Sequence, residues 1–188
     1  IESVADEAIL ETWLAISEKY RAVHVAVSDD SRSYERLLHF RHRLPENINA
    51  YFKSLHLTKI ALDIAVPAAR FEELFRFYRS ITSSITIQTV LFGHIGENHL
   101  HFNFFPKTEA ERATVQSLCE KCIRKALSFG GTVSAEHGIG KIKHHYLRMM
   151  FGEEGVAEML RVKKAFDPDG LMGPDNLFPV ETVLAFGT

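Results

Sequence analysis

The residues best suited to chemistry in this 188-residue sequence gather in one stretch, which runs from Gly93 to Asn103. His94 lies at the end of one predicted strand, and His101 lies in the next strand, across a tight turn. Side chains alternate between the two faces of a strand, so a hairpin of this kind can bring both imidazoles together. Paired neutral imidazoles are the usual core of a zinc or manganese site. The stretch therefore predicts a site for a divalent metal, Zn or Mn, held by His94 and His101.

A second cluster, at 134–140, offers a carboxylate beside a histidine, with glycines close by. It follows a short predicted strand over 132–135. Neighbouring residues on a loop point in different directions, so one can bind the metal while the other faces a substrate. We therefore predict Glu136 as the third ligand and His137 as the catalytic acid or base. Three protein ligands leave one coordination position open, which is typical of catalytic metal sites.

The other histidines and both cysteines have simpler interpretations. A single histidine is more often a surface or core residue than a ligand, and this interpretation is preferred for His24, His39, His42, His56, His144 and His145. Cys119 and Cys122 match a C-x-x-C pattern, but they lie on the apolar face of a predicted helix. They are therefore predicted to be buried structural residues and not a redox pair.

Three predicted strands and two predicted helices position these clusters. Alternating apolar residues predict strands over 59–66, 85–92 and 100–105. Pro67 ends the first strand and opens a helix, and a capping box at 108–111 begins the second helix. Long helices between well-separated antiparallel strands predict an α+β sandwich. We expect helices on one face of the sheet and the site on the other.

The two ends of the chain are predicted to be mainly helical. A helix is expected over 3–19, a strand over 23–27, and a second helix over 32–43 that Pro45 ends or kinks. Two further helices are expected between 142 and 166.

The composition is that of an ordinary globular protein, with 46% hydrophobic and 24% charged residues. The formal net charge of −2 gives no basic excess, which argues against nucleic acid as a partner. No apolar run approaches the roughly 18 residues of a membrane-spanning helix. Two cysteines do not make a disulfide framework, which fits a reducing cytoplasm. Without an internal repeat or a Gly/Ser linker, residues 1–188 are interpreted as a single domain.

The two clusters and a third stretch, Phe166–Pro174, together resemble the C-terminal domain of FAD-linked oxidases. That family includes D-lactate dehydrogenases, the glycolate oxidase D subunit and D-2-hydroxyglutarate dehydrogenase, within the vanillyl-alcohol oxidase superfamily. The three stretches occur in the family's order, and the resemblance extends from about Arg41 to Pro179. It implies a ferredoxin-like sandwich that covers the flavin ring and shapes the substrate site.

The resemblance also implies roles for single residues. His94, His101 and Glu136 match the family's metal ligands. Asn103 and His137 match its pair of substrate-facing residues. The metal ligands implied by the family are therefore the same three residues that the spacing predicts.

The sequence departs from the family's first motif, G-H-x-G-D-G-N-x-H, in the turn. Glu97, Asn98 and His99 stand where the family usually has Asp, Gly and Asn. Because Asn tolerates a left-handed backbone, the turn is expected to persist. His99 is expected to be either an extra ligand or an exposed side chain.

The resemblance implies a flavin-dependent dehydrogenase or oxidase of a D-2-hydroxy acid such as D-lactate, glycolate or D-2-hydroxyglutarate. The hydride would pass to FAD. Arg41 is similar to the arginine that binds the substrate carboxylate, with Arg43 as the alternative. The FAD-binding domain of the same protein is expected outside this chain, so the chain alone is expected to be inactive.

Two other functions use the same residues. One is a metal-dependent hydrolase with His137 as its base, and the other is a non-catalytic ferredoxin-like assembly module. A cytoplasmic location is expected, with peripheral attachment to the inner membrane as an alternative, and a homodimer is also considered.

Overall fold

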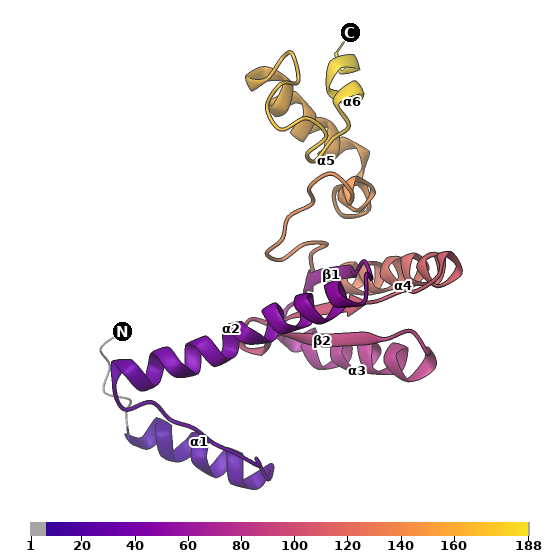
Figure 1. The fold of residues 1–188 in the computed structure, drawn as a ribbon. Helices are drawn as coiled ribbons and strands as arrows, with labels where there is room; N and C mark the ends of the chain where they lie inside the picture. The colour runs from indigo at the N-terminus through magenta and orange to yellow at the C-terminus, as the bar shows by residue number, and fades with distance from the viewer. Residues whose placement is uncertain (1–6, 188) are drawn as a thin grey trace. The chain divides into compact units, whose positions relative to one another are not determined.

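The structure is a computed structural model, and it describes residues 7–187 of the chain. The chain divides into two compact units, Ile1–Ser54 and Leu55–Thr188 (Figure 1). That one domain spans 1–188 stays a prediction. Among the described residues, no helix has both the length and the apolar character needed to cross a membrane.

The first unit contains two helices, α1 (Glu7–Lys19) and α2 (Ser31–Ser54). The first predicted helix is confirmed over 7–19, and residues 3–6 lie outside the described part of the chain. Of the two expectations at Pro45, an end of the helix is wrong, because α2 continues through this residue, and a kink stays a prediction. A proline inside a helix removes one backbone hydrogen bond, and the bonds on either side are sufficient here.

The expected strand over 23–27 is also wrong, since these residues have no regular secondary structure. Their valines alternate as in a strand, but Val23, Val25 and Val27 are all exposed. A strand is stabilised by hydrogen bonds to a neighbouring strand and by burial of one face. Alternation alone therefore does not produce a strand here.

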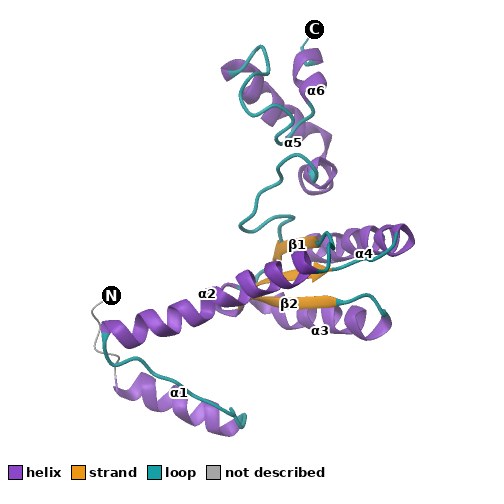
Figure 2. Cartoon of the chain, in the orientation of Figure 1, coloured by secondary structure: helices purple, strands orange, loops and turns teal. Residues whose placement is uncertain are grey.

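The second unit is built on a three-stranded antiparallel sheet with the strand order β1-β3-β2 (Figure 2). Its central elements, in chain order, are β1 (Ile60–Ala65), α3 (Ala68–Ser84), β2 (Thr89–His94), β3 (His99–Phe104) and α4 (Glu109–Ser128). The strand expected over 132–135 is reduced to a single antiparallel bridge between Ala65 and Thr132, which lies beside β1. This order is that of a ferredoxin-like α+β sandwich, which confirms the predicted fold class.

The two faces of β3 have different environments. Leu100, Phe102 and Phe104 belong to the main hydrophobic core, together with buried residues of α3 and α4. Successive side chains of a strand point to opposite faces, so the other three residues face away from this core: His99, His101 and Asn103. Helices cover one face of the sheet and polar side chains gather on the other, as expected.

Both ends of α4 are set by local contacts. The Thr108 side chain accepts a hydrogen bond from the Glu111 N–H at 3.1 Å, which confirms the predicted capping box. After α4 the chain returns to the edge of β1, where the Thr132 N–H donates to the Ala65 carbonyl at 2.9 Å. A Cβ atom on Gly131 would lie 2.4 Å from that carbonyl, so this close approach requires glycine. The turn carries the following loop across β1.

The C-terminal part contains α5 (His144–Phe166) and α6 (Val180–Ala185). Gly152 interrupts α5 with the non-helical backbone angles φ 67° and ψ 179°. The expectation of two helices between 142 and 166 is therefore confirmed. A second, smaller core is formed by Leu147, Val156, Leu160, Phe178 and Val183.

Replacing a core phenylalanine should test this account of the sheet. We expect Phe104→Ala to lower the free energy of unfolding by about 3–5 kcal/mol, because Phe104 is fully buried and its removal leaves a cavity. Phe166→Ala is the matched control, since Phe166 is 79% exposed. Urea titration followed by circular dichroism measures both variants. Equal losses in the two variants would contradict the assigned core face.

Candidate metal centre

The β2–β3 hairpin places the predicted histidines on one face of the sheet. A single 3-10 turn, Ile95–Glu97, joins the strands, and Asn98 closes it in the left-handed conformation (φ 56°, ψ 32°). His94 and His99 are then directly opposite each other in the ladder. A Cβ atom on Gly93 would lie 2.6 Å from the His99 carbonyl oxygen, so the hairpin requires glycine there. The turn persists despite its departure from the family motif, as expected.

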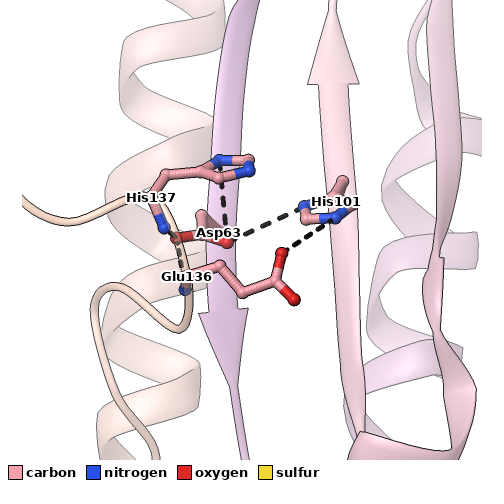
Figure 3. Close-up of side chains that lie close together, drawn as sticks. All are labelled: Asp63, His101, Glu136 and His137. Carbon is pink, nitrogen blue, oxygen red and sulfur yellow. Dashed lines mark hydrogen bonds and ion pairs between the residues drawn. The ribbon is translucent and has the colours of Figure 1, made fainter. Parts of the chain in front are cut away.

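Asp63, in the middle of β1, fixes the path of the 134–137 loop. Its side chain lies opposite His101 in the ladder and is almost completely buried, with 1% of its surface exposed. Its Oδ2 atom accepts hydrogen bonds from the Ser134 hydroxyl at 2.8 Å and from the N–H groups of Ala135, Glu136 and His137 at 3.2, 3.0 and 2.6 Å (Figure 3). The carboxylate thus gathers four consecutive residues of the loop around one atom.

These hydrogen bonds also set the charge of Asp63. Burial by itself would raise the pKa of this carboxyl group. The donors from His137, Ser134 and Glu136 outweigh burial and lower the pKa to about 2. Asp63 is therefore an ionised carboxylate at neutral pH.

The Glu136 side chain lies among three imidazoles. Its Oε1 atom is 3.3 Å from His94 Nε2 and 3.7 Å from His99 Nδ1. Its Oε2 atom is 3.7 Å from His101 Nε2. Figure 3 shows the Glu136 carboxylate directed at His101. Glu136 thus lies within 4 Å of both His94 and His101, the two imidazoles predicted as ligands, and their binding of one metal stays a prediction.

The distances from Glu136 to the imidazole nitrogens are similar to those between two ligands of one divalent metal. Two ligand atoms at roughly 2.1 Å from a tetrahedral ion lie about 3.4 Å apart. The separations of 3.3–3.7 Å between Glu136 and the imidazole nitrogens are close to this value. Burial, followed by the neighbouring His99 and His137, lowers the pKa of His101, and a neutral imidazole is the form that binds metal. The donor set therefore fits a divalent metal.

The potential ligands form two overlapping groups whose donor atoms lie within 4.8 Å of one another. These are Asp63, His101, Glu136 and His137 in the first, and His94, Glu97 and Glu136 in the second. Glu136 belongs to both groups, whereas His94 and His101 belong to different ones. Binding of one ion by both imidazoles therefore requires them to move closer together around the Glu136 carboxylate. Asp63 is a poor ligand despite its position, because hydrogen bonds already engage both of its oxygens.

The side chains of His137 and Glu136 both reach from the loop toward His101, and their donor atoms lie within 4.8 Å of each other (Figure 3). The ring of His137 stacks on that of His101, with centroids 4.8 Å apart and an angle of 5° between the planes. Its Nδ1 atom lies 3.7 Å from Asp63 Oδ1, and its side chain is 52% exposed. The imidazole is thus held beside the metal ligands and remains accessible.

The predicted substrate-binding residues lie in different parts of the structure. Asn103 is on the same face of β3 as His101, but only 2% of its surface is exposed. Arg41 and Arg43 lie on α2, in the first unit of the chain. Their roles in binding a substrate stay predictions.

Sequence reasoning missed Asp63 and left His99 open. The signal for Asp63 was a single charged residue in an otherwise apolar strand, since a buried carboxylate requires hydrogen-bonding partners. For His99, the alternative of an exposed side chain is wrong, because it is 2% exposed. Its spacing of two from His101 was the signal that both imidazoles share a face.

A pocket of about 280 Å³ lies elsewhere in the second unit, beside α5 and α6. It is lined by His144, His145, Leu147, Arg148, Val156, Leu177, Phe178, Pro179 and Thr182. It contains none of the residues around Glu136, so it is separate from the candidate metal centre.

Comparison with known proteins identifies one family. The model of the family described as FAD linked oxidases, C-terminal domain, matches residues 2–177. The chain is 32% identical over 119 residues to a mitochondrial D-lactate dehydrogenase [cytochrome] of Kluyveromyces lactis, covering 63% of this chain and 20% of that protein.

Two further relatives are named for other activities. Glycolate oxidase subunit GlcD of Bacillus subtilis is 33% identical over 125 residues, which cover 64% of this chain and 26% of GlcD. D-2-hydroxyglutarate dehydrogenase of Stutzerimonas stutzeri is 26% identical over 181 residues, which cover 92% of this chain and 37% of that enzyme. The chain thus spans well under half the length of these relatives.

The charge of Asp63 predicts a pH dependence of stability. The pKa of Asp63 is about 2 in the folded chain, against an ordinary value of 3.8. This difference corresponds to about 2 kcal/mol of stability. Because the folded pKa is the lower one, this contribution is complete above about pH 5 and is lost as the pH falls toward about 2. Denaturant titrations of metal-free protein at about pH 6 and pH 2 measure it.

The comparison uses Asp63→Asn, which cannot make this ionic contribution. We expect the wild type to lose about 2 kcal/mol more than Asp63→Asn between the two pH values. Asp169→Asn changes an exposed aspartate and should follow the wild type. The same acid loss in wild type and Asp63→Asn would show that Asp63 is not the group responsible.

Proposed function

Because the chain belongs to the family of C-terminal domains of FAD linked oxidases, we propose that it is the metal- and substrate-binding part of a flavin-dependent D-2-hydroxy-acid dehydrogenase. The observation that carries the proposal is the Glu136 carboxylate between His94 and His101, with His137 as its neighbour in the loop. The relatives are named for lactate, glycolate and 2-hydroxyglutarate, which share a hydroxyl group next to a carboxylate. A substrate of that chemistry suits a metal centre beside an accessible base.

In this proposal His94, His101 and Glu136 hold a divalent ion, Zn or Mn. When bound, such an ion polarises the substrate hydroxyl and lowers its pKa. Two of these residues differ in their surroundings, since His101 is buried in β3 whereas the Glu136 side chain is 42% exposed. Glu136 therefore has the freedom to adjust to the ion, and the open side of the cluster is the side on which substrate enters.

His137 is the proposed general base. It accepts the substrate hydroxyl proton at a ring nitrogen, as histidine commonly does in acid–base catalysis. Asp63 Oδ1 lies 3.7 Å from His137 Nδ1, so the ionised carboxylate stabilises the imidazolium that forms. The hydrogen bond of 2.6 Å from the His137 N–H to Asp63 Oδ2 holds the residue in place.

The remaining residues orient the substrate. Arg41, or Arg43 as the alternative, binds the substrate carboxylate through a forked pair of hydrogen bonds. Asn103 is the proposed polar contact on the sheet. The flavin, held mainly by a partner domain, supplies the hydride acceptor when bound. The family of the chain favours this oxidation over the alternatives of a hydrolase or an assembly module.

The proposal is tested on the full-length, flavin-loaded protein. We expect D-lactate, glycolate or D-2-hydroxyglutarate to bleach the flavin absorbance in an anaerobic stopped-flow experiment, and L-lactate to have little effect. Failure of all D-2-hydroxy acids to reduce the flavin would overturn the proposed substrate class. Cytoplasmic location, attachment to a membrane surface and dimer formation stay predictions.

Replacing the central carboxylate should release the metal. We expect Glu136→Gln to weaken Zn²⁺ binding by about 100-fold or more, because an amide is a much poorer ligand than a carboxylate. Isothermal titration of chelator-treated chain measures the affinity. Glu154→Gln, an exposed position on α5, is the matched control and should bind like the wild type. Unchanged affinity in Glu136→Gln would remove this residue from the ligand set.

Replacing the proposed base should separate chemistry from metal binding. We expect His137→Asn to lower kcat by about 10²–10⁴-fold in the full-length protein while the metal content stays at the wild-type level. If kcat is unchanged, or if metal is lost together with activity, His137 is not the base.

A further inference from the structure

His99 lies buried between two carboxylates. Its Nε2 atom is 2.7 Å from Asp63 Oδ1, and its Nδ1 atom is 3.7 Å from Glu136 Oε1. Its ring centroid is 4.5 Å from that of His101 and 5.8 Å from that of His94. It is therefore a third imidazole on the same side of the sheet as the proposed ligands.

The hydrogen bond to Asp63 assigns the proton of His99. An ionised carboxylate only accepts hydrogen bonds, and Asp63 already receives four from the 134–137 loop. The short contact to Oδ1 therefore places the proton on His99 Nε2. In the neutral imidazole this leaves Nδ1 with an unshared electron pair.

That electron pair faces the Glu136 carboxylate. The 3.7 Å between His99 Nδ1 and Glu136 Oε1 exceeds the length of a hydrogen bond. Two electron-rich atoms that face each other in this way are unfavourable unless a cation lies between them, even though the Glu136 side chain is partly exposed. The distance is close to the roughly 3.4 Å expected between two ligands of one ion.

The arrangement is also the usual support for a metal-binding histidine, whose other ring nitrogen donates to a carboxylate. His101 differs in this respect, because its Nδ1 atom has no hydrogen-bond partner among the described residues. Of the two buried imidazoles, His99 is thus the one already oriented for a metal.

We propose that His99 Nδ1 is an additional ligand of the metal, so that three imidazoles and Glu136 hold it. This inference rests on the proposed metal centre, and it concerns a position where the family motif usually has Asn. Four protein ligands would fill a tetrahedral ion, so an ion that also took a substrate oxygen would need five or more ligands. The extra imidazole therefore favours ions that accept five or six ligands.

The test counts imidazoles on the metal. The whole chain is stripped with a chelator, reloaded with Zn²⁺ alone, and measured by X-ray absorption, in which imidazole rings give a distinct multiple-scattering signal. We expect three imidazoles in the wild type and two in His99→Gln. Glutamine retains a donor near the position of Nε2 for Asp63, and it lacks the basic nitrogen that binds metal. His145→Gln, an exposed position on α5, should keep all three.

Zn²⁺ affinity provides a second readout. We expect His99→Gln to raise the Kd by about tenfold or more, with an unchanged far-ultraviolet circular dichroism spectrum. Two imidazoles in the wild type would overturn the role of His99 and leave the site of His94, His101 and Glu136 standing. A wild-type chain that binds no Zn²⁺ would overturn the metal centre itself. A wild-type count of two decides against His99 even if His99→Gln does not fold, and a count of three in His137→Asn excludes His137 as the third imidazole.

Discussion

The site depends on one buried carboxylate. Removing a charged group from water is costly unless hydrogen bonds replace its hydration, and Asp63 receives donors from the 134–137 loop and from His99. Because the charge can be satisfied only when loop and hairpin both reach β1, this single side chain couples segments that are far apart in the sequence. The positions of Glu136 and His137 follow from that coupling.

The ferredoxin-like sandwich provides the surface on which this coupling acts. Its helices occupy one face of the sheet, so the alternation of β3 sends Phe102 and Phe104 into the core and His101 to the opposite face. The alternation of side chains along β3 therefore supplies residues to the hydrophobic core and to the candidate site at the same time. The bridge at Thr132 then carries the loop over the polar face, beside β1.

Local patterns in the sequence were sufficient where a residue's role depends on its neighbours. Strand alternation and glycine-bracketed turns predicted a common site for His94, His101 and Glu136, and Glu136 lies within 4 Å of both imidazoles. Local patterns gave wrong or missing predictions where the structure of a residue depends on partners far away in the sequence. Alternating valines at 23–27 have no neighbouring strand, α2 passes through Pro45, and the partners of Asp63 lie some seventy residues away along the chain.

Distance alone would give Asp63 and Glu136 the same role, since donor atoms of both lie within 4.8 Å of those of His101. Hydrogen bonding separates them. The oxygens of Asp63 accept short hydrogen bonds of 2.6–2.8 Å from the chain, which leaves them little capacity to bind an ion. The oxygens of Glu136 face imidazole nitrogens at 3.3–3.7 Å, at or beyond the usual limit of a hydrogen bond. One carboxylate therefore organises the protein while the other remains available to a metal.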